Sequence, residues 1–356
     1  ERQILQYWPD AQISTKKRWV EYSSDYQTRQ TVDFEKKEII IDIITDIGET
    51  PGPPAPDISA SAPSVMGTST ADSPDLEQLF QQRLAELLQE DQQAAFERDQ
   101  LAQNIEKKLL DQSNQAKTDQ LSRQPILSGV VTATENPTPQ EIEQAARQLQ
   151  EAATMSHQPS NIPGKQIIRL RTALPANTLQ KKAAQYQPAV DRFARERGLT
   201  SALVLAVIHT ESAFNPMARS HVPAYGLMQI VPQSAGKDVS QRLFGEPLLL
   251  SPSYLYNSTN NINVGTTYLY ILYYNYLKAI NNPTSRLYCA IAAYNTGAGN
   301  VARAFVGTND VSRAASLINQ MPPENVYRHL ITNLPYQETR DYLQRVSRRI
   351  EAYQSM

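Results

Sequence analysis

The chain has 356 residues, of which 20% are charged, and its formal net charge is −2. Its length allows two domains, and every apolar stretch falls short of the roughly 18 residues that a membrane-spanning helix needs. The single cysteine, Cys289, excludes an intrachain disulfide and lies in an apolar run that predicts a buried core position. The chain begins at Glu1, with no initiator Met and no charged-then-apolar leader, which fits a processed or truncated protein.

Charge is divided unevenly between the two halves of the chain. Residues 1–180 hold 17 basic and 26 acidic side chains, whereas residues 181–356 hold 17 basic and 10 acidic ones. The basic carboxyl-terminal half would attract an anionic partner, such as nucleic acid or an acidic cell-wall polymer. No cluster of Lys and Arg interleaved with aromatic residues accompanies this charge, so an ordinary solvated basic face explains it equally well.

The amino-terminal residues alternate apolar and polar side chains in the manner of a β-sheet. This pattern covers residues 17–45 and ends in a β-branched run at residues 39–44. Residues 50–75 are rich in Pro, Gly, Ser and Ala, which predicts a linker or a long surface loop.

A helical insertion of about residues 75–120 follows, in which apolar residues recur at intervals of three and four. Its acidic character favours a solvated helix packed on its own domain over one that lies against a partner. Beyond it, strands are predicted at residues 126–132 and 166–172, with a helix near residues 140–155 between them. Because these strands flank the insertion, we expect them to pair with the first strands in an α+β domain of residues 1–175.

From residue 176 to residue 356 the pattern is that of an all-α domain. Its first clear helix begins with the capping candidates Thr200 and Ser201 and ends before Pro216. Three more helices are predicted, at residues 261–278, 285–294 and 336–354.

Glu211 lies in the last turn of that first helix, on the apolar stripe that also contains Leu203 and Val207. Burial there would raise the pKa of its carboxyl, because the charged form loses solvation, and the negative end of the helix dipole acts in the same direction. A carboxyl that stays protonated near neutral pH can protonate the leaving oxygen of a glycosidic bond. Taken alone, however, a glutamate in this position is also typical of a surface residue or a buried ion-pair partner.

Four motifs in the carboxyl-terminal half carry a resemblance to a known family: Glu211-Ser212, Gly226-Leu227-Met228-Gln229, Ala293-Tyr294-Asn295 and Tyr342. In order and spacing they resemble the family 1 lytic transglycosylases, which contain a soluble-lytic-transglycosylase-like (SLT) domain. The intervening Asn261 and Gly265 also fit this pattern. The resemblance covers about residues 185–350 and implies a lysozyme-like helical fold for the domain of residues 176–356.

The resemblance implies a reaction on peptidoglycan glycan strands, at the β-1,4 bond between N-acetylmuramic acid (MurNAc) and N-acetylglucosamine (GlcNAc). Glu211 would protonate the bridging oxygen and then take a proton from the muramyl 6-hydroxyl, which closes a 1,6-anhydro ring without water. No cofactor is implied, and peptidoglycan takes the place of nucleic acid as the expected partner. Substrate contacts are implied for seven residues: Ser212, Ser220, Met228, Gln229, Tyr294, Asn295 and Tyr342.

The distribution of carboxylates supports this reaction. Between Glu211 and Asn295 the only other acidic residues are Asp238 and Glu246, and residues 247–309 contain none. A hydrolase that inverts or retains configuration would need a second placed carboxylate.

Two alternatives to a lytic transglycosylase stay open. A goose-type lysozyme-like hydrolase shares the fold but returns a reducing sugar, and a non-catalytic peptidoglycan-binding module keeps the groove only. The presence of Glu211 with all four motifs argues against the non-catalytic module. No metal site is expected, because His209 and His221 have neither a two-histidine helix spacing nor a Cys/His cluster beside them.

The amino-terminal half resembles the domain that precedes the catalytic unit in a membrane-bound member of the same family. This resemblance rests on Tyr26-Gln27-Thr28-Arg29 before a strand and on Ile167-Ile168 before the helical domain. It implies a periplasmic protein whose full-length form is an outer-membrane lipoprotein, acylated on a cysteine upstream of Glu1 that this chain does not contain. For the amino-terminal domain itself, we expect binding of cell-wall protein partners or positioning of the catalytic domain.

Overall fold

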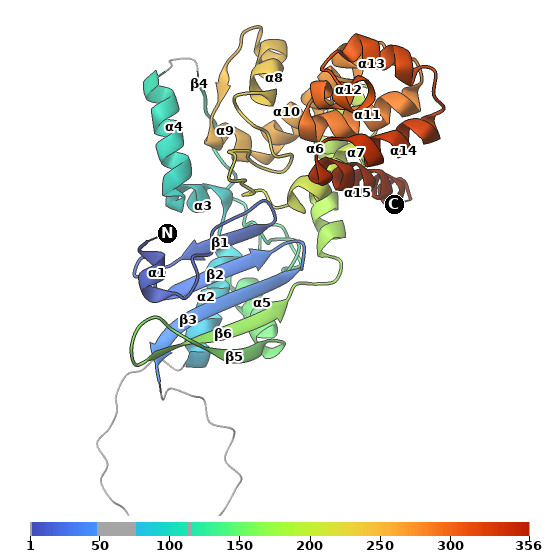
Figure 1. Ribbon diagram of the computed structural model, residues 1–356. Coiled ribbons are helices and arrows are strands. Elements are labelled where there is room, and N and C mark those ends of the chain that lie inside the picture. Colours follow the sequence, from blue (N-terminus) through green and yellow to red (C-terminus); the bar gives the residue numbers. More distant parts are fainter. Residues whose placement is uncertain (1, 48–75, 113–115, 356) are drawn as a thin grey trace, which may run out of the picture. The chain divides into compact units, whose positions relative to one another are not determined.

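The computed structural model of the chain describes residues 2–47, 76–112 and 116–355 (Figure 1). The predicted loop at residues 50–75 lies outside these ranges. The chain divides into two compact units, and each is assembled from segments that are separate in the sequence. The first unit contains Glu1–Ser14, Trp19–Glu90 and Gln124–Ala176, and the second contains Thr15–Arg18, Asp91–Arg123 and Asn177–Met356.

The predicted helical insertion is shared between the two units. Helix α2 (Leu76–Gln89) belongs to the first unit, whereas α3 (Gln92–Arg98) and α4 (Gln100–Gln112) belong to the second. One cause is aromatic packing, since Phe96 lies edge-on against Tyr256 with ring centroids 6.3 Å apart. The structure therefore differs from a single division at residue 175, because only α2 packs with the sheet unit.

The first unit contains a five-stranded sheet in the order β1-β2-β3-β6-β5 (Figure 1). The predicted pairing of the early strands with residues 166–172 is confirmed, because β3 lies antiparallel to β6 with Ile41 opposite Leu170. The strands of this sheet are β1 (Arg18–Tyr22), β2 (Thr28–Asp33), β3 (Glu38–Asp46), β5 (Thr154–Pro159) and β6 (Lys165–Ala173).

Helices α2 and α5 (Pro139–Glu151) pack against each other and against strands β3 and β6 (Figure 1). Helix α2 buries Phe80 and Leu84, which its leucine-rich pattern predicts. Helix α5 begins with a capping box, in which the side chains of Thr138 and Glu141 each accept a hydrogen bond from the backbone of the other residue.

One prediction for this unit is wrong, and one predicted helix is shorter than expected. Residues 126–132 form turns rather than a strand, and the left-handed Gly129 (φ +68°) interrupts any extended run there. The predicted helix near residues 140–155 ends at Glu151, because β5 begins at Thr154 and pairs with β6. The side chains of β5 are polar and mostly exposed, so they give no apolar alternation that would reveal the strand.

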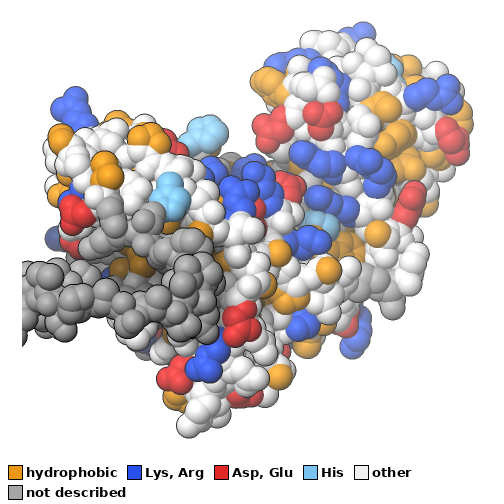
Figure 2. Space-filling model, turned by 90° about the horizontal axis from the view of Figure 1, so that it is seen from below, with side chains coloured by type: hydrophobic (Ala, Val, Ile, Leu, Met, Phe, Trp, Pro, Cys, Tyr) orange, Lys and Arg blue, Asp and Glu red, His pale blue; other side chains and the backbone are white. Residues whose placement is uncertain are grey.

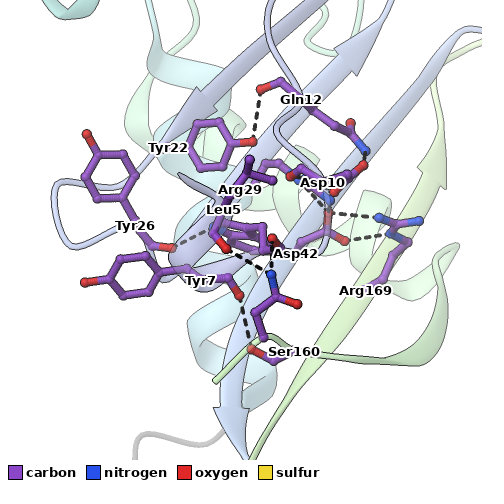
Figure 3. A network of polar contacts seen from close by, with 12 residues as sticks. Leu5, Tyr7, Asp10, Gln12, Tyr22, Tyr26, Arg29, Asp42, Ser160 and Arg169 are labelled. Carbon is purple, nitrogen blue, oxygen red and sulfur yellow. Dashed lines mark hydrogen bonds and ion pairs between the residues drawn. The ribbon is translucent and has the colours of Figure 1, made fainter. Parts of the chain in front are cut away.

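A buried row of charges crosses three neighbouring strands of this sheet (Figure 3). Arg29 on β2 lies opposite Asp42 on β3, which in turn lies opposite Arg169 on β6. Asp42 accepts two hydrogen bonds from Arg29 (3.0 and 2.8 Å) and two from Arg169 (2.6 and 3.1 Å). The guanidinium of Arg29 also lies 4.5 Å from the ring centroid of Trp8, which follows α1 (Ile4–Tyr7). Asp42 is therefore the shared counter-ion that allows both arginines to be desolvated.

Replacement of Asp42 should destabilise the first unit strongly. The side chains of Arg29 and Asp42 are 2% and 1% exposed, so Asp42→Ala leaves a buried guanidinium paired only with the carboxylate of Asp10, which is 52% exposed. We expect a loss of about 3–5 kcal/mol in the free energy of unfolding, measured by denaturant titration. The control is Asp46→Ala, which removes an ion-paired carboxylate that is 68% exposed and should cost less than about 1 kcal/mol. Equal losses for the two variants would contradict this interpretation.

The second unit is built around α7 (Ser201–Ser212). All side chains from Ala202 to Ile208 are buried, so this helix is enclosed by the fold on every side. Helices α6 (Thr178–Glu196) and α15 (Gln337–Gln354) pack directly against it. The predicted cap is confirmed, with Thr200 accepting a hydrogen bond at the amino terminus.

The other predicted helices are also present in this unit. Residues 261–278 correspond to α10 (Ser258–Tyr270) and its continuation as a π-helix (Ile271–Tyr276), and residues 285–294 lie in α11 (Pro283–Thr296). Cys289 on α11 is fully buried, as expected. The remaining elements are α8 (Ala235–Phe244), α9 (Pro252–Tyr256), α12 (Ala298–Val306), α13 (Val311–Ile318), α14 (Pro323–Asn333) and the parallel two-residue strands β4 (Ala116–Lys117) and β7 (Leu249–Leu250).

The described surface is of mixed character. Basic side chains are spread over the visible face and are interspersed with acidic, apolar and uncharged ones (Figure 2). Among the helices that the structure describes, none is both long enough and apolar enough to cross a membrane.

Candidate active site

Glu211 lies at the end of α7, and only 7% of its side chain is exposed. Burial is the largest influence on its carboxyl and raises the pKa of Glu211 above the ordinary value. The ammonium of Lys16, 3.7 Å from Oε2, and the hydroxyl of Tyr342 lower this pKa without cancelling the effect of burial. Glu211 therefore has the property that a general acid needs, because it retains its proton at a higher pH than an exposed glutamate.

The backbone that follows Glu211 is strained. Ala213 (φ +50°) and Phe214 (φ +63°) adopt left-handed conformations that residues other than glycine rarely take. Phe214 is fully buried and its ring stacks on that of Tyr186, with an interplanar angle of 6°. This packing fixes the sharp turn that ends α7 just after the carboxyl.

The loop Gly226-Leu227-Met228-Gln229 is attached to α10 by the fully buried side chain of Asn261. Its Nδ2 donates to the backbone oxygen of Leu255 (2.7 Å), and its Oδ1 accepts from the N–H of Met228 (2.7 Å). Gly226 has a φ of +74°, and a β-carbon there would lie 2.4 Å from both the Asn261 amide and the Leu255 oxygen. Only glycine fits this position, for reasons of conformation and of space.

Three predicted site residues hold this loop against the neighbouring helices. Ser212 Oγ donates to the backbone oxygen of Leu227 (2.8 Å), and the hydroxyl of Tyr294 donates to that of Met228 (2.8 Å). The side chain of Met228 packs against α10 at Gly265, where a β-carbon would collide with it. Ser212 and Met228 are fully buried, so in this structure they support the loop and offer no surface to a sugar, contrary to the expected substrate contacts.

Two other predicted residues present buried polar atoms that complete no hydrogen bond with any described residue: Oε1 of Gln229 and the hydroxyl of Tyr342. The amide of Gln229 is fixed on its other side, because Nε2 donates to the backbone oxygens of Ala218 (3.1 Å) and Gly226 (3.0 Å). The Tyr342 hydroxyl acts on Glu211 electrostatically but without ordinary hydrogen-bond geometry. A buried polar group without a partner costs free energy, so these two atoms indicate where a polar ligand would bind.

The last two predicted residues, Ser220 and Asn295, are half-buried. Ser220 Oγ donates to the backbone oxygen of Val222 and accepts from the N–H of Ala224 (3.2 Å). Oδ1 of Asn295 accepts a hydrogen bond from Thr339 Oγ1 (2.7 Å), which links α11 to α15. Both side chains keep exposed surface at which a substrate contact can form.

Sequence reasoning missed two contacts that come from far upstream in the chain. Lys16 reaches the carboxyl of Glu211, and Asp99 accepts two hydrogen bonds from Arg219 (2.7 and 2.6 Å), beside Ser220. Neither residue belongs to a motif, so no pattern in the sequence could have identified them. Within the described part of the chain, no group of three or more His, Cys, Asp and Glu side chains could hold a metal ion.

Two parts of the chain match known protein families. Residues 189–316 match the family described as the transglycosylase SLT domain. Residues 1–51 match the amino-terminal domain of membrane-bound lytic murein transglycosylase C. The predicted resemblance is confirmed: residues 189–316 match the transglycosylase SLT domain, and residues 1–51 match the amino-terminal domain of a lytic murein transglycosylase.

Curated relatives support the same assignment. The chain is 46% identical over 189 residues to membrane-bound lytic murein transglycosylase C of Serratia proteamaculans, which covers 52% of this chain and 51% of the relative. The protein of that name from Cronobacter sakazakii is 43% identical over 232 residues, or 64% of this chain and 62% of the relative. The matched part of the chain thus spans about half to three fifths of these relatives.

Solved structures of lytic transglycosylases also align with half of the chain. The 70 kDa soluble lytic transglycosylase of Escherichia coli is 26% identical, with a TM-score of 0.37, and the match covers 50% of this chain and 25% of that one. A complex of a 70 kDa soluble lytic transglycosylase with bulgecin A is 27% identical, with a TM-score of 0.39, and the match covers 50% of this chain and 25% of that one.

The close approach at Gly226 can be tested against a second left-handed glycine. Gly245 has a similar φ of +80°, but a β-carbon there would meet no atom within 4 Å. Gly245→Ala should therefore cost only about 1 kcal/mol for the unfavourable conformation. Gly226→Ala should cost at least about 3 kcal/mol, because a backbone oxygen must also move, and it should displace Gln229. Thermal unfolding of both variants measures the difference, and similar costs would argue against the tight loop.

Proposed function

We propose that the protein is a lytic transglycosylase that cleaves the β-1,4 bond between MurNAc and GlcNAc in peptidoglycan and leaves a 1,6-anhydromuramyl end. The observation that carries this proposal is the buried carboxyl of Glu211, whose pKa is raised above its ordinary value within the SLT motifs. The hydroxyl of Tyr342 and Oε1 of Gln229 support it, since both are buried polar atoms suited to a polar substrate.

In the proposed reaction Glu211 supplies and recovers one proton. Its carboxyl gives the proton to the oxygen that links C1 of MurNAc to GlcNAc, and the C1–oxygen bond breaks. The muramyl 6-hydroxyl oxygen then bonds to C1, and its proton passes to the carboxylate of Glu211. One carbon–oxygen bond breaks, another forms, and no water is consumed.

The alternative reading is a goose-type lysozyme-like hydrolase, which would need a base to activate water and, in most such enzymes, a second carboxylate. Glu338, in the first turn of α15, is an acidic group that acts on Glu211. Its side chain is 69% exposed and lies 3.8 Å from Nζ of Lys16. An exposed, ion-paired carboxylate is a poor general base, so this environment favours the reaction without water.

We also propose a periplasmic location, with the full-length protein held at the outer membrane as a lipoprotein. The support is the resemblance to relatives that are named membrane-bound. The proposed role of the first unit is to bind cell-wall protein partners or to position the catalytic unit.

Glu211→Gln tests the proposal. A glutamine keeps the shape of the side chain but cannot donate or recover the proton, so release of anhydromuropeptides from purified sacculi should fall by at least about 1,000-fold. The control is Glu246→Gln, which changes an exposed carboxylate of the same unit and should leave the rate unchanged. Mass spectrometry of the digest identifies the products.

The same digest separates the alternatives. Glu338→Gln should still release anhydromuropeptides if the reaction is lytic, whereas a hydrolase that relies on Glu338 would lose its activity. Reducing muropeptides from the wild-type protein would exclude the lytic reaction. Unchanged release by Glu211→Gln would exclude Glu211 as the acid.

Tyr342→Phe should separate stability from activity. Because the hydroxyl of Tyr342 completes no hydrogen bond with the described residues, its removal should change the melting temperature very little. Loss of a hydrogen bond to the reacting groups should nevertheless lower kcat/KM by about 10- to 100-fold. A variant that is destabilised and fully active would show that the hydroxyl serves the fold.

A further inference from the structure

A lysine from the start of the chain reaches the catalytic carboxyl of the SLT domain. Lys16 lies in Thr15–Arg18, the short segment before most of β1 that packs within the second compact unit. Its Nζ lies 3.7 Å from Oε2 of Glu211 and 3.8 Å from Oε1 of Glu338. Lys16 falls outside the residues that match the SLT domain family.

The backbone of this segment is held in place on both sides of the lysine. The N–H of Thr15 donates to the backbone oxygen of Arg18 (2.8 Å), and Thr15 Oγ1 accepts from the N–H of Arg18 (3.2 Å), which closes a tight turn. Nδ2 of the fully buried Asn215 donates to the backbone oxygen of Lys16 (3.4 Å). Asn215 directly follows the strained turn after Glu211, so the segment is anchored beside the catalytic group.

We propose that Lys16 is a positioning residue of the active site, whose ammonium stabilises the ionised form of Glu211 that must accept the proton in the second step. This inference rests on the proposed lytic function. A buried carboxyl alone gives a good proton donor but makes the carboxylate costly once the proton has left. An ammonium within 4 Å lowers that cost, and the side chain of Lys16 is 36% exposed.

Among the other groups around Glu211, the neutral hydroxyl of Tyr342 also lowers the pKa of Glu211, whereas Lys16 supplies a positive charge. Tyr294 on α11 and Tyr342 on α15 are both buried, and burial raises the pKa of each hydroxyl well above its ordinary value, so both stay neutral. Glu338 on α15 carries a negative charge and raises the pKa of Glu211, against the effect of Lys16. Lys16 thus lowers the pKa of Glu211, whereas burial and Glu338 both raise it.

The pH dependence of kcat/KM tests this role. The first step requires protonated Glu211, so activity must fall as the pH rises through the pKa of that carboxyl. Lys16→Met should raise this pKa and move the alkaline limb upward by about one pH unit. Lys16→Arg keeps the charge and should restore the wild-type limb. Lys278→Met removes an exposed cation from the same unit and should leave the limb in place.

Glu338→Gln provides an independent test, because it should shift the alkaline limb in the opposite direction. Loss of that negative charge should lower the pKa of Glu211 and move the alkaline limb downward, even if Lys16→Met does not fold. The proposal would be overturned if the alkaline limb of a folded Lys16→Met variant coincided with that of the wild type. A Glu338→Gln limb that coincided with that of the wild type would also overturn it. The product tests the proposed function separately. If the alkaline limb shifts as expected but the products are reducing rather than anhydro muropeptides, the lytic reaction is refuted and the role of Lys16 is not.

Discussion

The arrangement of the second unit depends on a carboxyl held out of water at the end of an enclosed helix. Helix α7 is buried on all sides along most of its length, and at its last turn only 7% of the Glu211 side chain is exposed. Desolvation makes ionisation costly and so favours the protonated form. Glu211 therefore keeps its proton at a higher pH than a glutamate on the surface, as the proposed proton donor requires.

The frame around the carboxyl is built largely from backbone hydrogen bonds. Asn261 fixes the glycine-containing loop to α10, while Ser212 and Tyr294 attach the same loop to α7 and α11. Ser212, Met228 and Tyr294, for which the motifs predict substrate contacts, thus support the loop in this structure. Oε1 of Gln229 and the hydroxyl of Tyr342 complete no hydrogen bond with any described residue, so a sugar could satisfy them. Lys16, which lies outside the residues that match the SLT domain, completes this frame through its contact with the carboxyl of Glu211.

Much of this could be predicted from the sequence, for identifiable reasons. Glu211 lies on a helical stripe, and four ordered motifs predicted its proposed role as the acid, while the helices of residues 176–356 followed from apolar periodicity. The same reasoning failed at β5, whose exposed polar side chains carry no alternation, and at residues 126–132, where a β-branched run is interrupted by Gly129. It also missed Lys16, because a single lysine far upstream has no local signal. Periodicity reports burial within an element, and it cannot report which distant segment covers a site.

The measurement that tests the central claim most directly is digestion of purified sacculi in water enriched in oxygen-18. If Glu211 regains its proton from the muramyl 6-hydroxyl as the ring closes, no water oxygen enters the product. The muramyl ends released by the wild-type protein should then carry no label, and their masses should be the same in ordinary and enriched water. Incorporation of one labelled oxygen at each new muramyl end would contradict the account and identify the protein as a hydrolase.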